Sequence, residues 1–322
     1  MQIFHNPNYN FIRWRWHAIA LSAAIIIAGA VMMTRGVPLG IDFSGGTLVR
    51  VKFEQPVSED QVRGALDAIP GDKVVQQFGP VEDREIMIRL PLDQTAEQGT
   101  SLEQGARRVE EALQKAGLPK FEIVVRDLVG PVIGADLQRK GIYATLASII
   151  AITIYIALRF RPSFAIGAIA ATLHDILVTL AFLQFFKYEL SLNIVAAILT
   201  ITGYSVNDTI VIFDRVRENM RNKRREPLDQ VVNTAVNQTL SRTIITAGTT
   251  FLSVLSLYIF GGEALRGFSF TMLVGIISGT YSTVFIASAI AIILSKKPGT
   301  SAAAPTADAA RPTRKQKGAK AS

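Results

Sequence analysis

The sequence predicts a bundle of six membrane-spanning helices with one α+β domain inserted after the first helix. Three observations support this fold class: apolar residues gather in six long runs, a polar segment follows the first run, and basic residues flank the runs on one side. Hydrophobic residues make up 49% of the 322 positions and charged residues 19%. Six apolar helices could not all be buried in one small soluble core. The composition therefore excludes a soluble enzyme, a secreted disulfide scaffold and a disordered chain.

Each apolar run has roughly the 20 residues that a helix needs to cross the hydrocarbon core of a bilayer. The first run follows Arg13 and Arg15 and lacks the small-residue exit of a cleaved signal peptide, so we expect it to remain as an anchor over residues 17–35. The other helices are expected within residues 141–294. The six runs cover residues 16–34, 141–158, 162–186, 190–213, 243–262 and 267–295.

The basic residues predict the orientation of the chain. One set of connections contains 18 Lys and Arg, and it includes segments 1–16, 159–161, 214–242 and 295–322. The short opposite connections contain three. Cytoplasmic connections carry such an excess, so we predict that both termini are cytoplasmic and that residues 36–140 form a periplasmic domain. The predicted location is a bacterial cytoplasmic (inner) membrane.

The charge balance also excludes a nucleic-acid partner. Residues 36–140 carry a net charge of −4 and the rest of the chain carries +12, beside the apolar runs. We expect residues 214–242 to form an amphipathic, partly helical cytoplasmic loop on the inner leaflet, with the basic run 221–225 near anionic membrane lipid. The tail, residues 295–322, is rich in Ala, Pro and Lys and is predicted to be disordered and cytoplasmic.

The polar segment 36–140 predicts a small α+β domain. Four stretches have the alternation of strands, and two have the period and end signals of helices. Their order is strand, helix, strand, strand, helix, strand, which is the ferredoxin-like (βαββαβ) arrangement. Such a fold does not by itself indicate a chemistry. The expected strands are 47–53, 73–78, 84–90 and 121–128, and the helices are 58–69, capped by Ser58, and one from Ser101 with Leu102, Ala106, Val109 and Leu113 on one face.

Several reactive groups are missing from the sequence. It contains no cysteine and three histidines, which excludes disulfides, thiol chemistry and a His-rich metal site. No nucleotide-binding loop and no protease or hydrolase motif is present. We therefore predict a protein that is not an enzyme, with no cofactor and no bound metal.

Polar residues inside the fourth apolar run are the first candidates for function. Thr200, Gly203, Tyr204, Asn207 and Asp208 have the spacing of one helix face. An ionisable side chain at membrane depth costs roughly 2.5–3.5 kcal/mol and so indicates a function. We expect this stripe to face neighbouring helices. The opposite face is expected to meet lipid, with Ile201, Val206 and Ile210.

The fifth run carries a matching polar face. Arg242 stands at its cytoplasmic start, and its long side chain could reach the depth of Asp208. A guanidinium that approaches a buried carboxyl group stabilises the ionised form, so a moving Arg242 could switch Asp208 as a proton relay requires. Alternatively, the two residues form a static bridge that only fixes helix packing. The remaining polar residues of this face are Thr246, Thr249, Thr250 and Ser253.

The third run contains His174 and Asp175, with Thr172 and Thr179 on the face of Asp175. His174 could titrate near neutral pH. The alternative is a polar pair that holds helices together or binds a neighbouring Ser or Thr. The GxxxG pattern at residues 275–279 is interpreted as a packing feature.

Five motifs together resemble the SecF family of bacterial protein-export subunits, over about residues 10–295. The resemblance implies a related partner, SecD, the SecYEG channel, YajC and a translocating preprotein. It also implies an architecture like half of a resistance-nodulation-division transporter, use of the proton-motive force, and a proton pathway through Asp208 and Arg242. The motifs are GIDFSGGT at 40–47, VGPVIG at 129–134, His174-Asp175, GYSVNDTIVIFDR at 203–215 and SRT at 241–243.

Other interpretations remain open at this point. The main alternative is half of a proton-driven exporter of small molecules or lipids from the same superfamily. A scaffold subunit with a static bridge is another. Na⁺ could replace H⁺ as the coupling ion, because Asn207 and Asp208 with nearby threonines would also suit a sodium site.

Overall fold

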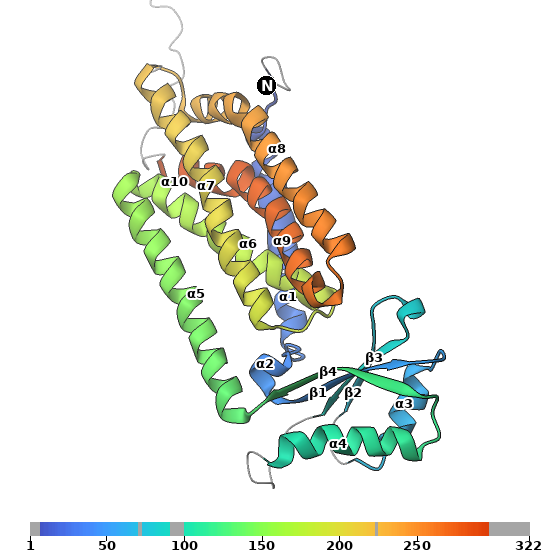
Figure 1. Cartoon of the computed structure of the whole chain (residues 1–322). Coiled ribbons are helices and arrows are strands. Elements are labelled where there is room, and N and C mark those ends of the chain that lie inside the picture. Colours follow the sequence, from blue (N-terminus) through green and yellow to red (C-terminus); the bar gives the residue numbers. More distant parts are fainter. Residues whose placement is uncertain (1–6, 70–72, 91–99, 223–224, 296–322) are drawn as a thin grey trace, which may run out of the picture.

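Long helices and a small sheet domain at one end of them make up the computed structural model, which describes residues 7–69, 73–90, 100–222 and 225–295 (Figure 1). Within these residues six helices are long and apolar enough to cross a membrane, as the sequence predicts. The sixth span is interrupted by a π-helical turn, η3 (Thr283–Ala287). The spans are α1 (Arg15–Met33, after a 3₁₀ turn η1, Ile12–Trp14), α5 (Pro131–Arg159), α6 (Pro162–Phe185), α7 (Leu192–Asn222), α8 (Leu228–Phe260) and α9 (Glu263–Ser282) with η3 and α10 (Ser288–Ser295).

The spans differ in how far this chain buries them. Half or more of the most apolar part of α6, of α7 and of the sixth span is buried, whereas 6% of that part of α5 is buried. The central helices approach closely through small residues. A Cβ on Gly275 of α9 would lie 2.2 Å from the side chain of Ile201 of α7. The bundle therefore has three central helices and three that expose most of their surface.

The polar domain contains an antiparallel four-stranded sheet in the order β2-β3-β1-β4. One face of this sheet is covered by α3 and α4, and the other face is turned toward the membrane helices (Figure 1). All four strands begin and end within two residues of their expected positions. The elements in chain order are β1 (Gly46–Phe53), α3 (Glu59–Ala65), β2 (Val74–Phe78), the 3₁₀ turn η2 (Val81–Asp83), β3 (Glu85–Leu90), α4 (Thr100–Lys115) and β4 (Phe121–Val129).

Alternation along the strands sorts this domain into a core face and a polar face. Val49, Val51 and Phe53 of β1 are buried against α3 and α4, and the residues between them turn to the other face. Ser58 caps α3 with a capping box that includes Gln61, as its position predicts. Ala106, Val109 and Leu113 of α4 join the same core, whereas the side chain of Leu102 lies outside the described residues.

A short joint connects the sheet domain to the membrane helices. It contains α2 (Ile41–Ser44), followed by Gly45 and Gly46 with positive φ angles of 68° and 125°. The amide of Gly40 donates to the Leu190 carbonyl at 2.8 Å, and the Leu190 amide donates to the Pro38 carbonyl at 2.7 Å. These two bonds pair the chain after α1 with the connection between α6 and α7.

Side chains reinforce the same joint. Asp42 Oδ2 accepts a hydrogen bond of 2.9 Å from the amide of Leu192, the first residue of α7. Arg89 of β3 donates to Glu189 Oε2 at 2.7 Å and to the Leu39 carbonyl at 2.8 Å. Because Arg89 projects from the polar face of the sheet, this face meets the membrane unit.

The segment 214–242, predicted as an amphipathic and partly helical loop, is more helical than expected. Helix α7 continues to Asn222 and α8 begins at Leu228, so the described residues of this segment belong mostly to the two helices. Figure 1 shows the first turns of α8 lying across the end of the bundle. Their apolar face is buried, since Val232 and Val236 pack in the core. The predicted disordered tail lies outside the described residues, apart from Ser295.

Candidate functional site

Asp208 lies in α7 and is buried, with 5% of its surface exposed. Its Oδ2 atom has no hydrogen-bond partner among the described residues. The Tyr204 hydroxyl, one turn earlier on α7, and the Thr243 hydroxyl of α8 are also buried and also lack a partner there. A buried polar atom without a partner is costly, so α7 and α8 carry polar groups that the fold of this chain does not satisfy.

The orientation of α7 contradicts one expectation. Ile201 and Val206, expected to meet lipid, are buried inside the bundle, whereas Thr200, Gly203 and Asn207 are exposed. The reason is packing against α9, where Gly279 approaches Ser205 as Gly275 approaches Ile201. Small residues permit this contact, and it fixes the rotation of α7 so that Thr200, Gly203 and Asn207 face outward while Asp208 stays buried.

The polar face of α8 is likewise exposed, and its hydroxyl groups bond within the helix. Thr246, Thr249, Thr250 and Ser253 each donate to the carbonyl four residues earlier, at 2.8–3.0 Å. Arg242 is exposed. Such bonds satisfy the hydroxyl groups within α8 itself.

Arg242 and Asp208 are close enough to interact electrostatically but do not touch. The charge of Arg242 acts on the Asp208 carboxyl group. None of the ion pairs formed by the described residues joins the two side chains, however. The static bridge that the sequence allowed is therefore not formed in this conformation. In this conformation the Asp208 carboxylate therefore lies near the Arg242 cation without a direct ion pair.

Asp175 of α6, unlike Asp208, is surrounded by hydrogen-bond donors. It is 1% exposed, and its oxygens accept hydrogen bonds from Ser278 and Ser282 of α9, both at 2.7 Å. Ser205 of α7 donates to Oδ2 at 2.5 Å, and His174 Nδ1 lies 3.0 Å from Oδ1. The carboxylate thus holds α6, α7 and α9 together.

His174 extends this network to α1. Its Nε2 atom lies 2.8 Å from Ser22 Oγ, and its ring stacks on Tyr281 at 6.1 Å between centroids. The Tyr281 hydroxyl donates to the Ala18 carbonyl of α1 at 2.7 Å. The arrangement favours the interpretation of His174 and Asp175 as a polar pair that holds helices together through Ser neighbours.

The serines of this network were not among the residues selected from the sequence. Ser278 and Ser282 are one turn apart on one face of the sixth span, and that spacing was the available signal. Serines are common in membrane helices as small packing residues, so their pattern alone does not identify the carboxylate they bind. Thr172 bonds within its own helix, to the Ala168 carbonyl at 3.0 Å.

The two aspartates therefore suit different tasks. Asp175 accepts hydrogen bonds from three serines and lies 3.0 Å from His174 Nδ1, and a proton added there would displace donors. Asp208 is buried and has an oxygen without a partner among the described residues, next to the exposed Asn207. A proton can bind this oxygen without breaking a hydrogen bond.

Family models match most of the chain. The model described as "Protein export membrane protein SecD/SecF, C-terminal" matches residues 108–297. The model described as "SecD/SecF GG Motif" matches residues 30–57, which include the joint around α2. Together they span the joint and the five spans from α5 onward.

Curated relatives and solved structures agree with these models. The chain is 40% identical to Protein translocase subunit SecF of Desulfurispirillum indicum over 88% of this chain and 90% of that protein. It is also 40% identical to the subunit of that name from Escherichia coli O157:H7, over 90% of this chain and 88% of that protein. The crystal structure of SecDF from Thermus thermophilus, titled a translocon-associated membrane protein, matches with a TM-score of 0.80 and 32% identity. That match covers 91% of this chain and 39% of that chain.

Proposed function

The chain belongs to the SecD/SecF family of protein export membrane proteins, as a SecF-type subunit of the Sec translocation machinery, and we propose that it uses the proton-motive force through Asp208 to promote preprotein export. The observation that carries this proposal is the contrast between the two aspartates. Only one of them offers an oxygen without a hydrogen-bond partner, and it lies beside Arg242.

The exposed polar stripe of α7 supports a membrane partner. Thr200, Gly203 and Asn207 face outward, and polar side chains are unfavourable against lipid tails. A second helical bundle with its own polar face would cover them. SecD fits this role, because the matching SecDF structure is one chain of which this chain covers 39%. SecYEG, YajC and the preprotein are further proposed partners.

The proposed orientation follows the basic residues. Both termini and the α7–α8 connection lie on the cytoplasmic side of a bacterial inner membrane, and the sheet domain lies outside. We propose that this domain has the ferredoxin-like arrangement. The element order β1-α3-β2-β3-α4-β4 and the sheet order β2-β3-β1-β4 support it. The family likeness to translocase subunits supports transport without catalysis by this chain.

The proposed cycle begins when Asp208 takes a proton from an exterior-facing water path. The neutral carboxyl group loses its attraction to Arg242, and the helices of the two bundles shift. Release of the proton to the cytoplasm restores the charge and resets the pair. A potential of 100 mV supplies about 2.3 kcal/mol for each charge moved. Conformational states commonly differ by a few kcal/mol, so this energy is enough to bias two arrangements.

Helix α7 provides the path from the proton to the exterior domain. It runs without a break from Leu192, which bonds to Asp42 in the joint, to Asp208. At 1.5 Å per residue this is about 24 Å. A tilt of α7 is therefore transmitted to α2 and to the sheet domain, where it would change how an emerging preprotein is held or released.

Proton flux tests the proposal. The chain is reconstituted with its SecD partner in vesicles, and flux is measured under an imposed pH gradient. We expect wild type to conduct and Asp208→Asn to conduct at background level, with Arg242→Met also strongly reduced. The matched control is Asp229→Asn, which removes a half-buried carboxylate at the start of α8 and should leave flux unchanged.

Two results would overturn the proposal. Equal flux in wild type and Asp208→Asn would make Asp208 a structural residue. Flux that responds to a sodium gradient and not to a proton gradient would replace H⁺ by Na⁺ as the coupling ion while keeping Asp208 as its site.

A further inference from the structure

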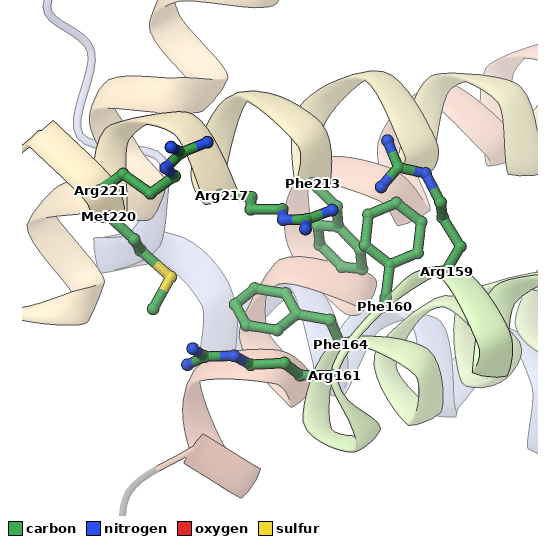
Figure 2. A pocket seen from close by; sticks show the side chains of 8 residues that line it. All are labelled: Arg159, Phe160, Arg161, Phe164, Phe213, Arg217, Met220 and Arg221. Atoms are coloured by element: carbon green, nitrogen blue, oxygen red, sulfur yellow. The ribbon is translucent and has the colours of Figure 1, made fainter.

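A cavity of about 730 Å³ opens at the end of the bundle away from the sheet domain. It lies where α5 ends, α6 begins and the last turns of α7 pass. Four arginines, three phenylalanines and one methionine line it, and the aromatic rings lie between the arginine side chains (Figure 2). The lining residues are Arg159, Phe160, Arg161, Phe164, Phe213, Arg217, Met220 and Arg221.

The cavity carries an excess of positive charge. Arg159 donates to both oxygens of Asp214, at 2.9 and 3.1 Å. Arg161, Arg217 and Arg221 form no ion pair with the described residues, and all three are exposed. Placing four guanidinium groups around one cavity is repulsive unless an anion lies between them. Guanidinium groups bind phosphate with two parallel hydrogen bonds, so a phosphate is the expected anion.

The floor of the cavity is apolar. Phe164 and Phe213 are 6% and 1% exposed, and their rings meet edge to face at 5.1 Å. Phe160 packs on Phe213 at 5.9 Å. A soluble anion gains nothing from such a surface. A ligand that carries both a phosphate and hydrocarbon uses the arginines and the rings together.

The neighbouring surface of α5 can hold the hydrocarbon. Ile150, Ile154 and Leu158 follow one another at intervals of four residues and are 57%, 54% and 85% exposed. They share one face of the helix, which leads toward Arg159. Since α5 buries little of its surface in this chain, a lipid alongside it meets no competing protein contact from the described residues.

We propose that this cavity binds the phosphate headgroup of an anionic phospholipid, with its acyl chains along the exposed face of α5. In the proposed orientation the site lies at the inner leaflet, where basic cavities between membrane helices bind such headgroups. The lipid joins α5 to α6 and α7. It thus completes the packing of the span that the chain itself buries least.

The test measures lipid binding by the full chain in complex with SecD. Dioleoyl phosphatidylglycerol and dioleoyl phosphatidylcholine are titrated in detergent, and bound lipid is counted by native mass spectrometry. We expect phosphatidylglycerol to bind more tightly than phosphatidylcholine. The double variant Arg161→Gln/Arg217→Gln should raise the apparent Kd for phosphatidylglycerol roughly thirtyfold. Arg13→Gln/Arg15→Gln removes the same charge at the same end of the bundle, outside the cavity, and should leave the Kd unchanged.

Two further arms separate the sources of the phosphate and guard against misfolding. Inorganic phosphate and glycerophosphoglycerol at millimolar concentration should not displace the lipid. In the unaltered chain, a photoactivatable phosphatidylglycerol should crosslink to peptides that contain residues 154–164 or 213–221. Equal Kd values in wild type and the cavity variant, displacement by inorganic phosphate, or crosslinks confined to other peptides would each overturn the proposal.

Discussion

Asp175 of α6 and Asp208 of α7 are both buried, but hydrogen-bond donors surround only Asp175. We therefore expect the loss of Asp175 to lower the stability of the protein and the loss of Asp208 to abolish transport. Asp175→Ala leaves Ser205, Ser278 and Ser282 without their acceptor. Hydrogen bonds between membrane helices contribute about 0.6 kcal/mol each on average. We therefore expect the free energy of unfolding to fall by about 2 kcal/mol, seen as a lower midpoint when heated samples are separated by size-exclusion chromatography.

The matched variant Asp208→Asn should leave that midpoint unchanged or raise it, because no hydrogen bond to Oδ2 is lost and a buried charge is removed. Ser278→Ala should lower it by less than Asp175→Ala does. A midpoint that falls more in Asp208→Asn than in Asp175→Ala would show that the two aspartates have been assigned the wrong roles.

Glu189 gives the joint a pH dependence. Burial raises the pKa of the Glu189 carboxyl above its ordinary 4.5, and Arg89 offsets this only in part. Glu189 therefore binds a proton more tightly when the joint is formed than when the joint is broken and Glu189 is in water. The stability of the formed joint falls as the pH rises from 4.5 through the raised pKa. We expect protection of the Leu190 amide from hydrogen exchange, corrected for the intrinsic rate, to decrease over this range.

Glu189→Gln removes the titrating group and should make that protection independent of pH in this window. Wild-type protection that grows with pH, or the same slope in both proteins, would contradict the assignment. The amide of Val195, which bonds within the first turn of α7 to Ser191, serves as an internal reference.

Sequence reasoning at the residue scale found the groups but not their partners. Helical spacing grouped Asp208 with Asn207 and Tyr204, but it could not show that Asp208 is buried while Asn207 is exposed. It could not show that Asp175 is bound by Ser278 and Ser282, which follow more than 100 positions later. Periodicity describes one helix, whereas hydrogen bonds between helices depend on how each is rotated.

At the scale of elements, the crossing of α7 and α9 depends on the absence of side chains at two glycines. A Cβ at Gly275 would lie 2.2–2.5 Å from three atoms of Ile201. Gly275→Ala should therefore force the helices apart and lower the free energy of unfolding by about 1–3 kcal/mol. The measurement is the thermal midpoint of the purified chain.

Gly248→Ala of α8 is the control, because a Cβ there meets nothing within 4 Å. It should be neutral or slightly stabilising, since Ala favours a helix over Gly. If both alanine variants lower the midpoint equally, close packing does not explain the sensitivity of Gly275.

The elements themselves were largely predictable, and their ends and rotations were not. Apolar runs gave the six spans, and alternation gave the four strands within two residues. The fourth apolar run was ended at Phe213 because charge begins at Asp214, and the partly helical segment predicted after it proves to be a continuation of α7 to Asn222. The lipid-facing side of α7 was assigned wrongly because apolar residues such as Ile201 suit a protein core as well as lipid.

At the scale of the whole molecule, the exposed stripe of α7 predicts where the second bundle binds. A Cβ at Gly203 meets nothing within 4 Å in this chain. Gly203→Leu should therefore leave the thermal midpoint of the isolated chain unchanged and reduce co-purification with SecD at least severalfold. Gly64→Leu in α3 is the control, at another glycine with open space around it but in the sheet domain.

If Gly203→Leu co-purifies with SecD as wild type does, the partner covers another surface. The exposed face of α5 would then be the next surface to test, because α5 is the span with the smallest buried share.

The joint around α2 also has a mechanical consequence. The Gly40–Leu190, Leu190–Pro38 and Asp42–Leu192 bonds join the chain after α1 to the connection between α6 and α7, and the Arg89–Glu189 pair joins the same connection to β3. A pull on the sheet domain loads them in parallel, so they share the tension and rupture together rather than one after another. Helix α7 then behaves as a stiff rod attached at its end. In the proposed cycle, work done by a proton at Asp208 would leave the membrane as force on a chain outside it, with little of it lost to stretching the connection.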